Sequence, residues 1–252
     1  MIDKLGKEGI YIIHALKGYE FHENRLIEFF KENELNFEFV TDGDPSHFSD
    51  ELLYKYFTPD IKQHLSVGVN SCTLNHILAY KKMVENNIEI GLILENDPFF
   101  TKNFKEKLEN MTGEINGLEK GFIVSLENTT LMFPSYWDTK RNKHLYQAKQ
   151  GRAAGAYLID LEGAKRIIKD LESNKCHTVI DWWHNRLIDR EIVKMYWAFP
   201  GLTEQGSHNG LLSSTISSKS KSNARRVKWL LQKFYKMYIR RLFKEPKVIN
   251  IN

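Results

Sequence analysis

The 252-residue sequence predicts an α/β fold with a mixed, mostly parallel sheet flanked by helices, followed by a basic amphipathic helix at the C-terminal end. Short apolar runs alternate with segments of helical periodicity along most of the chain, which is typical of α/β proteins. Aromatic residues make up 12% of the chain and charged residues 27%, so an intrinsically disordered protein is excluded. No apolar run approaches the roughly 20 residues that span a bilayer.

The first elements are a strand, a helix and a second strand. Residues 9–13 are apolar and rich in β-branched side chains, and residues 23–34 have apolar side chains at helical spacing. Residues 36–40 alternate polar and apolar side chains and end at a turn sequence, residues 41–45. This succession is typical of the opening of an α/β sheet.

The same alternation continues along the chain. We expect helices at 71–84, 161–171 and 180–188, and strands at 88–94, 121–126, 153–159 and 193–198. One globular domain over residues 1–216 accounts for all of these elements.

The charge distribution separates this domain from a tail, residues 217–252. Residues 217–247 contain eleven Lys or Arg and one acidic residue, whereas residues 1–216 contain 25 basic and 31 acidic residues. Within residues 224–244 the apolar side chains share one helical face, opposite most of the basic ones. Such a helix is expected to bind an anionic membrane surface, although packing on the body or a dimer contact would also explain it.

A nucleic-acid-binding protein is the competing class, because the tail is both basic and aromatic. The acidic body and the helical spacing of the tail's apolar residues argue against it, so we expect no nucleic-acid partner. Cys72 and Cys176 form neither a disulfide framework nor a zinc-type cluster, and the N-terminal residues contain no long apolar stretch. We therefore expect a cytoplasmic protein.

Glu95-Asn96-Asp97 directly follows an apolar strand and is the most informative motif. In α/β proteins ligands bind beyond the carboxyl ends of the strands, so two carboxylates there are well placed for Mg²⁺ or Mn²⁺. An ordinary solvated turn explains Asn-Asp-Pro about equally well.

Three further segments have both a functional and a structural interpretation. Residues 65–76 place Gly and Ser before a helix whose N–H groups could contact a phosphate or a sugar, or simply form a capped helix. Residues 151–164 are rich in small side chains that admit a ligand or mark a bend. Residues 181–184, Asp-Trp-Trp-His, combine an acid with indoles that stack on sugars or fill a core.

Five ordered segments together resemble glycosyltransferase family 25, the lipooligosaccharide galactosyltransferases of bacterial envelopes. The family's LS-x-G-x-x-x-C-x-x-S-H block is similar to residues 65–76, and its ILEDD block to residues 93–97. Its GTAGYIIS-x-x-GA block resembles residues 152–164, its PVD block residues 179–181, and its NPAL-x-x-Q-x-x-H block residues 199–208. The resemblance covers roughly residues 9–216.

The resemblance implies a nucleotide-sugar fold of the GT-A type and an inverting transfer from a UDP-sugar, most simply UDP-galactose. The acceptor would be a lipid-linked oligosaccharide of the lipopolysaccharide core, with the enzyme peripheral on the inner face of the bacterial inner membrane. The cofactor would be Mn²⁺ or Mg²⁺.

The residues implied for each role are drawn from the matching segments. For the metal they are Asp97, Glu95 and His208, and for the general base Asp181, with Glu127 and Glu204 as rivals. Donor-binding residues would be Ser66, Gly68, Asn75, His76, Glu95, Asn96, Gly155 and Gln205, and acceptor-binding residues Trp182 and Trp183.

The sequence departs from the family pattern at two places. Asn96 replaces the middle Asp of the acidic motif, which also leaves open a degenerate, inactive member that only binds. The N-terminal block reads Ile13-His14-Ala15-Leu16 with the single Arg25, in place of Asn-Leu and paired arginines.

Overall fold

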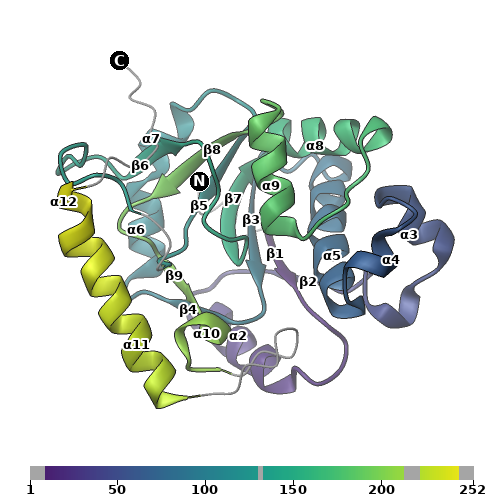
Figure 1. The fold of residues 1–252 in the computed structure, drawn as a ribbon, viewed down its shortest axis with the longest axis horizontal. Coiled ribbons are helices and arrows are strands. Elements are labelled where there is room, and N and C mark those ends of the chain that lie inside the picture. Colours follow the sequence, from purple (N-terminus) through teal and green to yellow (C-terminus); the bar gives the residue numbers. More distant parts are fainter. Residues whose placement is uncertain (1–8, 130–132, 213–221, 244–252) are drawn as a thin grey trace.

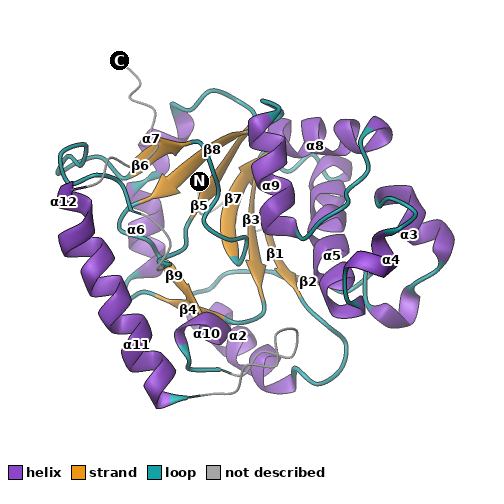
Figure 2. Ribbon diagram, in the orientation of Figure 1, coloured by secondary structure: helices purple, strands orange, loops and turns teal. Residues whose placement is uncertain are grey.

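The computed structural model describes residues 9–129, 133–212 and 222–243, and for His208 it describes the backbone alone. These residues form a seven-stranded sheet covered by helices on both faces, with a separate two-stranded sheet (Figures 1 and 2). The predicted α/β class and mostly parallel sheet are confirmed. None of the described helices combines the length and apolar character that crossing a membrane requires.

The large sheet has the strand order β2-β1-β3-β7-β5-β8-β6, and within it only β7 and β6 run against the other five strands. Its strands are β1 (Ile10–Ile13), β2 (Glu38–Val40), β3 (Ile90–Glu95), β5 (Phe122–Ser125), β6 (Leu145–Ala148), β7 (Ala156–Asp160) and β8 (Lys194–Ala198). The small sheet pairs β4 (Pro98–Phe100) with β9 (Thr203–Gln205).

The reversed strand β7 gathers three chain segments at one edge of the sheet. Because β7 pairs antiparallel with both β3 and β5, the residues that lead into β7 lie beside those that leave β3 and β5. Leu94 pairs with Ala156, and the Glu95 N–H donates to the Gly155 carbonyl at 2.8 Å. The acidic motif therefore faces the small-residue segment that precedes β7.

The two faces of the sheet are buried in separate cores. Along β1, Tyr11 and Ile13 belong to one buried cluster, and Ile10 and Ile12 belong to the other. The first cluster includes side chains of α3 (Asp50–Tyr56), α4 (Ile61–His64), α5 (Val67–Glu85), α8 (Leu161–Ser173) and α9 (Ile180–Asp189). The second includes side chains of α2 (Glu20–Glu32), α6 (Phe104–Asn110) and α7 (Thr112–Asn116).

Helix α5 begins four residues before the predicted start at residue 71. The Ser66 hydroxyl accepts a hydrogen bond from the Val69 N–H at 3.4 Å and caps the helix. The apolar spacing that predicts this helix begins only after its first turn, because Val67 and Gly68 of that turn line a pocket instead of packing in the core. The short turns η1 (Pro45–His47) and α10 (Gly206–Asn209) complete the body.

The tail forms α11 (Asn223–Phe234), which continues through the π-helical turn η2 (Tyr235–Arg240) into α12 (Arg241–Phe243) and packs along the body (Figure 1). The Arg226 and Lys233 side chains lie 3.3 and 2.5 Å from the Glu204 carboxylate. Arg241 donates to the Pro134 carbonyl at 2.6 Å, and Trp229 is buried. The helix thus turns basic side chains toward the body.

The opposite face of the tail helix is apolar and exposed. Leu231 is 65% exposed, Phe234 57% and Tyr238 60%. The predicted domain boundary at residues 216 and 217 lies outside the described residues, so the division into 1–216 and 217–252 stays a prediction.

Asp160 ties the end of β7 to two neighbouring elements. Its buried carboxylate accepts backbone N–H groups of Gly121 at 3.0 Å, Phe122 at 2.8 Å and Gly163 at 3.0 Å. One side chain therefore caps α8 and fixes the start of β5.

We predict that Asp160→Ala lowers the free energy of unfolding by about 3 kcal/mol or more, because each buried N–H left unpaired costs about 1–3 kcal/mol. Asp160→Asn, which retains one acceptor oxygen, should lose less. Urea unfolding followed by circular dichroism measures both. Glu162→Ala, on the first turn of the same helix, is the control and should change stability by less than about 0.5 kcal/mol. Equal losses of stability in Asp160→Ala and the control would contradict the role of Asp160 as the acceptor that joins β7 to β5 and α8.

Candidate active site

The two acidic residues at the end of β3 have different surroundings. The Glu95 carboxylate accepts the Gln205 side-chain N–H at 3.0 Å and is partly exposed. Asp97 is 6% exposed, and its Oδ2 accepts the Ser207 N–H at 2.8 Å. Its Oδ1 has no hydrogen-bond partner among the described residues. Asn96 lies between them, with its side-chain nitrogen 3.4 Å from His14 Nδ1.

Glu127, just beyond β5, approaches the acidic motif from the other side of β7. It is 1% exposed, and neither of its carboxylate oxygens has a hydrogen-bond partner within the described part of the chain. A Cβ on Gly155 would lie 2.5 Å from Glu127 Oε1 and 2.1 Å from Gln205 Nε2. Glycine is therefore required at 155, because these two side chains cross its backbone.

Four carboxyl groups share the electrostatic field of this region. Burial raises the pKa of Glu127 well above its ordinary value, and Glu95, Asp181 and Asp97 raise it further. Burial also raises the pKa of Asp181 to about 7, with a further contribution from Glu95. These effects favour the neutral form of Glu127, whereas Asp181 changes its charge near neutral pH.

A pocket of about 650 Å³ opens beside Glu95 at the N-terminal end of α5. Among its lining residues are five of the residues implied for the donor, namely Ser66, Gly68, Asn75, Glu95 and Asn96. His14, Tyr19 and Cys72 also line it. Its size suits a small ligand, and the N–H groups of a helix N-terminus favour an anionic one.

Asn75 and His76 support this pocket from the interior. Asn75 accepts the Gly43 N–H at 2.7 Å and donates to the His14 carbonyl at 3.4 Å, so it fixes the loops that follow β1 and β2. His76 is completely buried, and burial lowers its pKa to about 3. Its Nδ1 lies 2.8 Å from the Tyr157 hydroxyl, and its Nε2 lies 3.7 Å from Glu95 Oε1.

The two tryptophans differ in exposure. Trp182 is 66% exposed, so its indole is available to a sugar. Trp183 is 2% exposed and packs in the core, so its ring faces are not available to an acceptor. Trp183 is therefore a core residue in this structure, contrary to the expectation for acceptor binding.

Two other implied residues lie near the tail. The Glu204 carboxylate pairs with Arg226 and Lys233 and accepts hydrogen bonds from Asn128 and Asn209 at 3.3 Å. These contacts give it a clear role in anchoring the tail helix and leave it poorly placed to collect a proton. His208 lies on α10, the turn whose Ser207 N–H contacts Asp97, but its side chain is outside what is described, so its metal role stays a prediction.

Arg25, the single arginine in place of the paired arginines of the family pattern, lies close to the acidic motif. Its Nη1 donates to the Pro98 carbonyl at 2.5 Å, while its Nε and Nη2 have no partner among the described residues. Burial lowers its pKa, and the charge of Asp97 opposes that shift. The helical spacing of residues 23–34 gave no signal that this side chain reaches the acidic motif.

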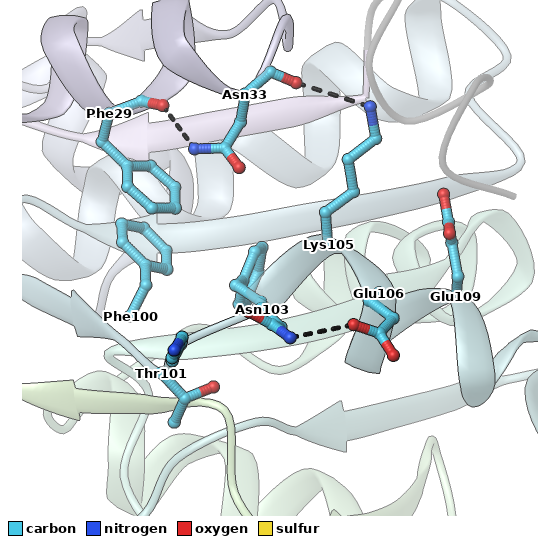
Figure 3. A pocket seen from close by; sticks show the side chains of 10 residues that line it. Phe29, Asn33, Phe100, Thr101, Asn103, Lys105, Glu106 and Glu109 are labelled. Carbon is cyan, nitrogen blue, oxygen red and sulfur yellow. Dashed lines mark hydrogen bonds between the residues drawn. The ribbon is translucent and has the colours of Figure 1, made fainter.

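A second pocket, of about 680 Å³, lies between α2, β4 and α6. Figure 3 shows the stacked rings of Phe29 and Phe100 on one side of it and the Asn103–Glu106 hydrogen bond on another. None of the implied site residues lines this pocket. The pocket beside Glu95 is therefore the candidate active site.

The carboxylate cluster fits a hard divalent cation. Asp97 Oδ1 is buried without a hydrogen-bond partner among the described residues, and carboxylate oxygens are the ligands that Mg²⁺ and Mn²⁺ prefer. A cation here would also relieve the mutual repulsion of these acids. The site can thus combine anion binding beside α5, a cation near Asp97, and an acid–base group at Asp181.

Comparisons with known proteins show which family this chain resembles. A family model described as "Glycosyltransferase family 25 (LPS biosynthesis protein)" matches residues 9–182. A "Glycosyltransferase 25 family member" of Aedes aegypti is 24% identical over 89% of this chain and 40% of its own. "Procollagen galactosyltransferase 2" of Homo sapiens is 24% identical over 66% of this chain and 28% of its own. A Haemophilus influenzae protein named "Putative glycosyltransferase" is 25% identical over 69% of this chain and 64% of its own.

This chain spans less than half the length of the Aedes aegypti and human relatives. The chain covers 40% of the Aedes aegypti relative and 28% of the human one.

We predict that Asp181→Asn stabilises the protein increasingly as the pH rises from 4 to 8. In the unfolded chain Asp181 loses its proton near its ordinary value of 3.8, whereas in the folded protein it keeps the proton up to about pH 7. Folding therefore becomes less favourable across this window, by up to about 4 kcal/mol at its upper end. Asparagine removes that cost and still accepts the Ala154 N–H hydrogen bond.

Urea unfolding at pH 4 to 8 tests this. Asp189→Asn, at the exposed end of the same helix, is the matched control and should show no such trend. A pH-independent difference between Asp181→Asn and the wild type would contradict the burial of this acid.

Proposed function

Because the chain belongs to glycosyltransferase family 25, we propose that it is an inverting hexosyltransferase that uses a UDP-sugar, most simply UDP-galactose. The electrostatic interaction of Glu127 with Glu95, Asp97 and Asp181, together with the 650 Å³ pocket that Glu95 lines, carries this proposal. The galactosyltransferase name of the human relative supports galactose as the transferred sugar. The proposed fold type is GT-A, and the pocket lies beside Glu95 at the carboxyl end of β3, where α/β proteins bind ligands.

The donor is proposed to bind with its nucleotide in the pocket and its diphosphate toward the N-terminal end of α5. Ser66, Gly68, Asn75 and Asn96 line that space, and the Arg25 guanidinium lies near Asp97. A cationic side chain and helix N–H groups both stabilise a diphosphate.

A divalent ion, Mn²⁺ or Mg²⁺, would be held mainly by Asp97 with Glu95 and His208, and would supply positive charge against the diphosphate leaving group. Asn96 leaves both outer acids of the motif in place, which supports an active enzyme over a degenerate one. Gln205 holds Glu95 in position through its hydrogen bond.

The acceptor hydroxyl is proposed to attack C1 of the sugar as the bond from C1 to the phosphate oxygen breaks, and UDP leaves. Asp181 takes the hydroxyl proton, because a carboxylate with a pKa near 7 is a suitable base at neutral pH. Glu127 is the weaker candidate, since burial and its acidic neighbours raise its pKa well above the ordinary value. Trp182 offers an exposed indole on the same helix for the acceptor sugar.

The first experiment is UDP release from a panel of UDP-sugars, with and without Mn²⁺, by purified full-length protein. We expect metal-dependent turnover of one donor. Asp181→Asn should bind UDP as the wild type does and lose at least about 100-fold in turnover, as expected for a missing base. Asp189→Asn should behave as wild type.

Weakened UDP binding with normal turnover in Asp181→Asn would contradict its role as base. No turnover of any donor and no metal-dependent UDP binding would favour the degenerate member that only binds.

The family description supports an acceptor in lipopolysaccharide biosynthesis, and we propose a lipid-linked oligosaccharide at the inner face of a bacterial inner membrane. The exposed apolar face of α11 to α12 supports contact with a membrane surface. The contacts of Arg226, Lys233 and Arg241 with the body leave fewer basic side chains for any anionic partner, so the membrane proposal depends on the exposed apolar face.

We predict that Leu231→Ser combined with Phe234→Ser lowers binding to anionic vesicles by at least about tenfold. Full burial of a Leu or Phe side chain contributes about 1.5–3 kcal/mol to the binding free energy, and serine removes that contribution. Both residues are exposed, so folding should be unchanged. Vesicle co-sedimentation measures the binding, and Gln232→Ser, on the same turn, is the control. Equal binding of the double variant and the control would refute the membrane contact.

A further inference from the structure

Cys72, His76 and Glu95 form a cluster at the floor of the donor pocket. Cys72 and His76 are one turn apart on α5, and Glu95 is the last residue of β3. Glu95 Oε1 lies 3.8 Å from Cys72 Sγ and 3.7 Å from His76 Nε2, and the three atoms all lie within 4.8 Å of one another. The three side chains thus converge on one point.

One ring nitrogen of the buried His76, Nε2, is oriented as a metal ligand would be. His76 is 0% exposed, and within the described part of the chain its Nε2 makes no hydrogen bond. Its Nδ1 is engaged with the Tyr157 hydroxyl, which in turn contacts Tyr80, and Tyr80 lies 2.7 Å from His184 Nε2. When Nδ1 donates to Tyr157, Nε2 presents a lone pair toward Glu95, an arrangement that a cation between them would stabilise.

The spacing and chemistry of the three atoms fit zinc. Tetrahedral Zn²⁺ with sulfur, nitrogen and oxygen ligands places those ligand atoms about 3.3–3.7 Å apart, close to the 3.7 and 3.8 Å found here. Two ligands at positions i and i+4 of one helix is also a common zinc arrangement.

The outer contacts of the cluster are those of a metal site. The Tyr157 hydroxyl orients the imidazole, and the Gln205 side-chain N–H holds the second oxygen of Glu95 at 3.0 Å. Partners of this kind fix the orientation of metal ligands.

We propose that Cys72 Sγ, His76 Nε2 and Glu95 Oε1 form a zinc-binding site whose fourth position opens to the donor pocket. This site shares Glu95 with the oxygen-rich position near Asp97 but selects a different ion, because a thiolate and an imidazole favour Zn²⁺ over Mg²⁺ or Mn²⁺. Cys72 and Glu95 both line the pocket, so the ion would lie on its floor. A consequence that rests on the proposed function is that Zn²⁺ inhibits transfer by taking Glu95 from the catalytic ion.

Cobalt provides the direct test, because Co²⁺ bound to a thiolate gives a charge-transfer absorption band in the near ultraviolet. Full-length, tag-free, reduced protein without any nucleotide is titrated with Co²⁺ and then with Zn²⁺. We expect one equivalent of Co²⁺ to produce the band and Zn²⁺ to remove it.

The chain contains two cysteines, which gives a matched pair of variants. Cys72→Ser should abolish the band and weaken Zn²⁺ binding by at least about tenfold. Mutation of residues that only hydrogen-bond to metal ligands already costs that much affinity. Cys176→Ser should retain the band, because Cys176 is buried elsewhere and contacts the Thr178 carbonyl. The absence of a band in the wild type, or its persistence in Cys72→Ser, would overturn the proposal.

A second measurement needs no variant. Zn²⁺ should slow alkylation of Cys72 by iodoacetamide at least about tenfold relative to Mg²⁺, as read by mass spectrometry of the peptide. Equal alkylation rates with the two ions would overturn the site. Since neither measurement involves a sugar donor, failure of the zinc site and failure of the proposed transferase activity give different results.

Discussion

The crowding of carboxyl groups at one edge of the sheet is the constraint on which the site depends. Glu127 and Asp97 are buried, Asp181 keeps its proton to about pH 7, and Glu95 raises the pKa of both Glu127 and Asp181. Folding must hold these acids together against desolvation and mutual repulsion, so the surrounding structure has to be rigid. A bound cation would offset this electrostatic cost.

The direction of β7 makes this crowding possible. Had β7 run parallel to β3 and β5, the residues before it would lie at the other edge of the sheet, away from Glu95 and Glu127. Its reversal brings Gly155 between these acids, where only glycine leaves room for Gln205 and Glu127. The small-residue segment thus serves close side-chain packing around the site.

Much of the sheet could be predicted because β1, β3, β5 and β8 are continuous apolar runs whose burial appears directly in the sequence. The small sheet could not, since β4 begins with Pro98 and β9 contains Glu204 and Gln205, and their pairing is purely tertiary. The acid-x-acid motif after β3 lies close to Glu127 and Asp181 in the structure, whereas its metal site stays a prediction. Arg25 and Cys72 come from helix faces, and which face a helix turns inward depends on the packing of the whole domain.

The short strand β9 has a consequence for communication within the molecule. Successive residues of a strand point to opposite sides, so Glu204 holds the tail helix while its neighbour Gln205 holds Glu95. The residue that anchors the tail helix is therefore bonded directly to the residue that positions Glu95. If movement of the tail helix on Glu204 changes the affinity of the site for a ligand, thermodynamic linkage requires that binding of this ligand changes the binding of the tail helix by the same factor.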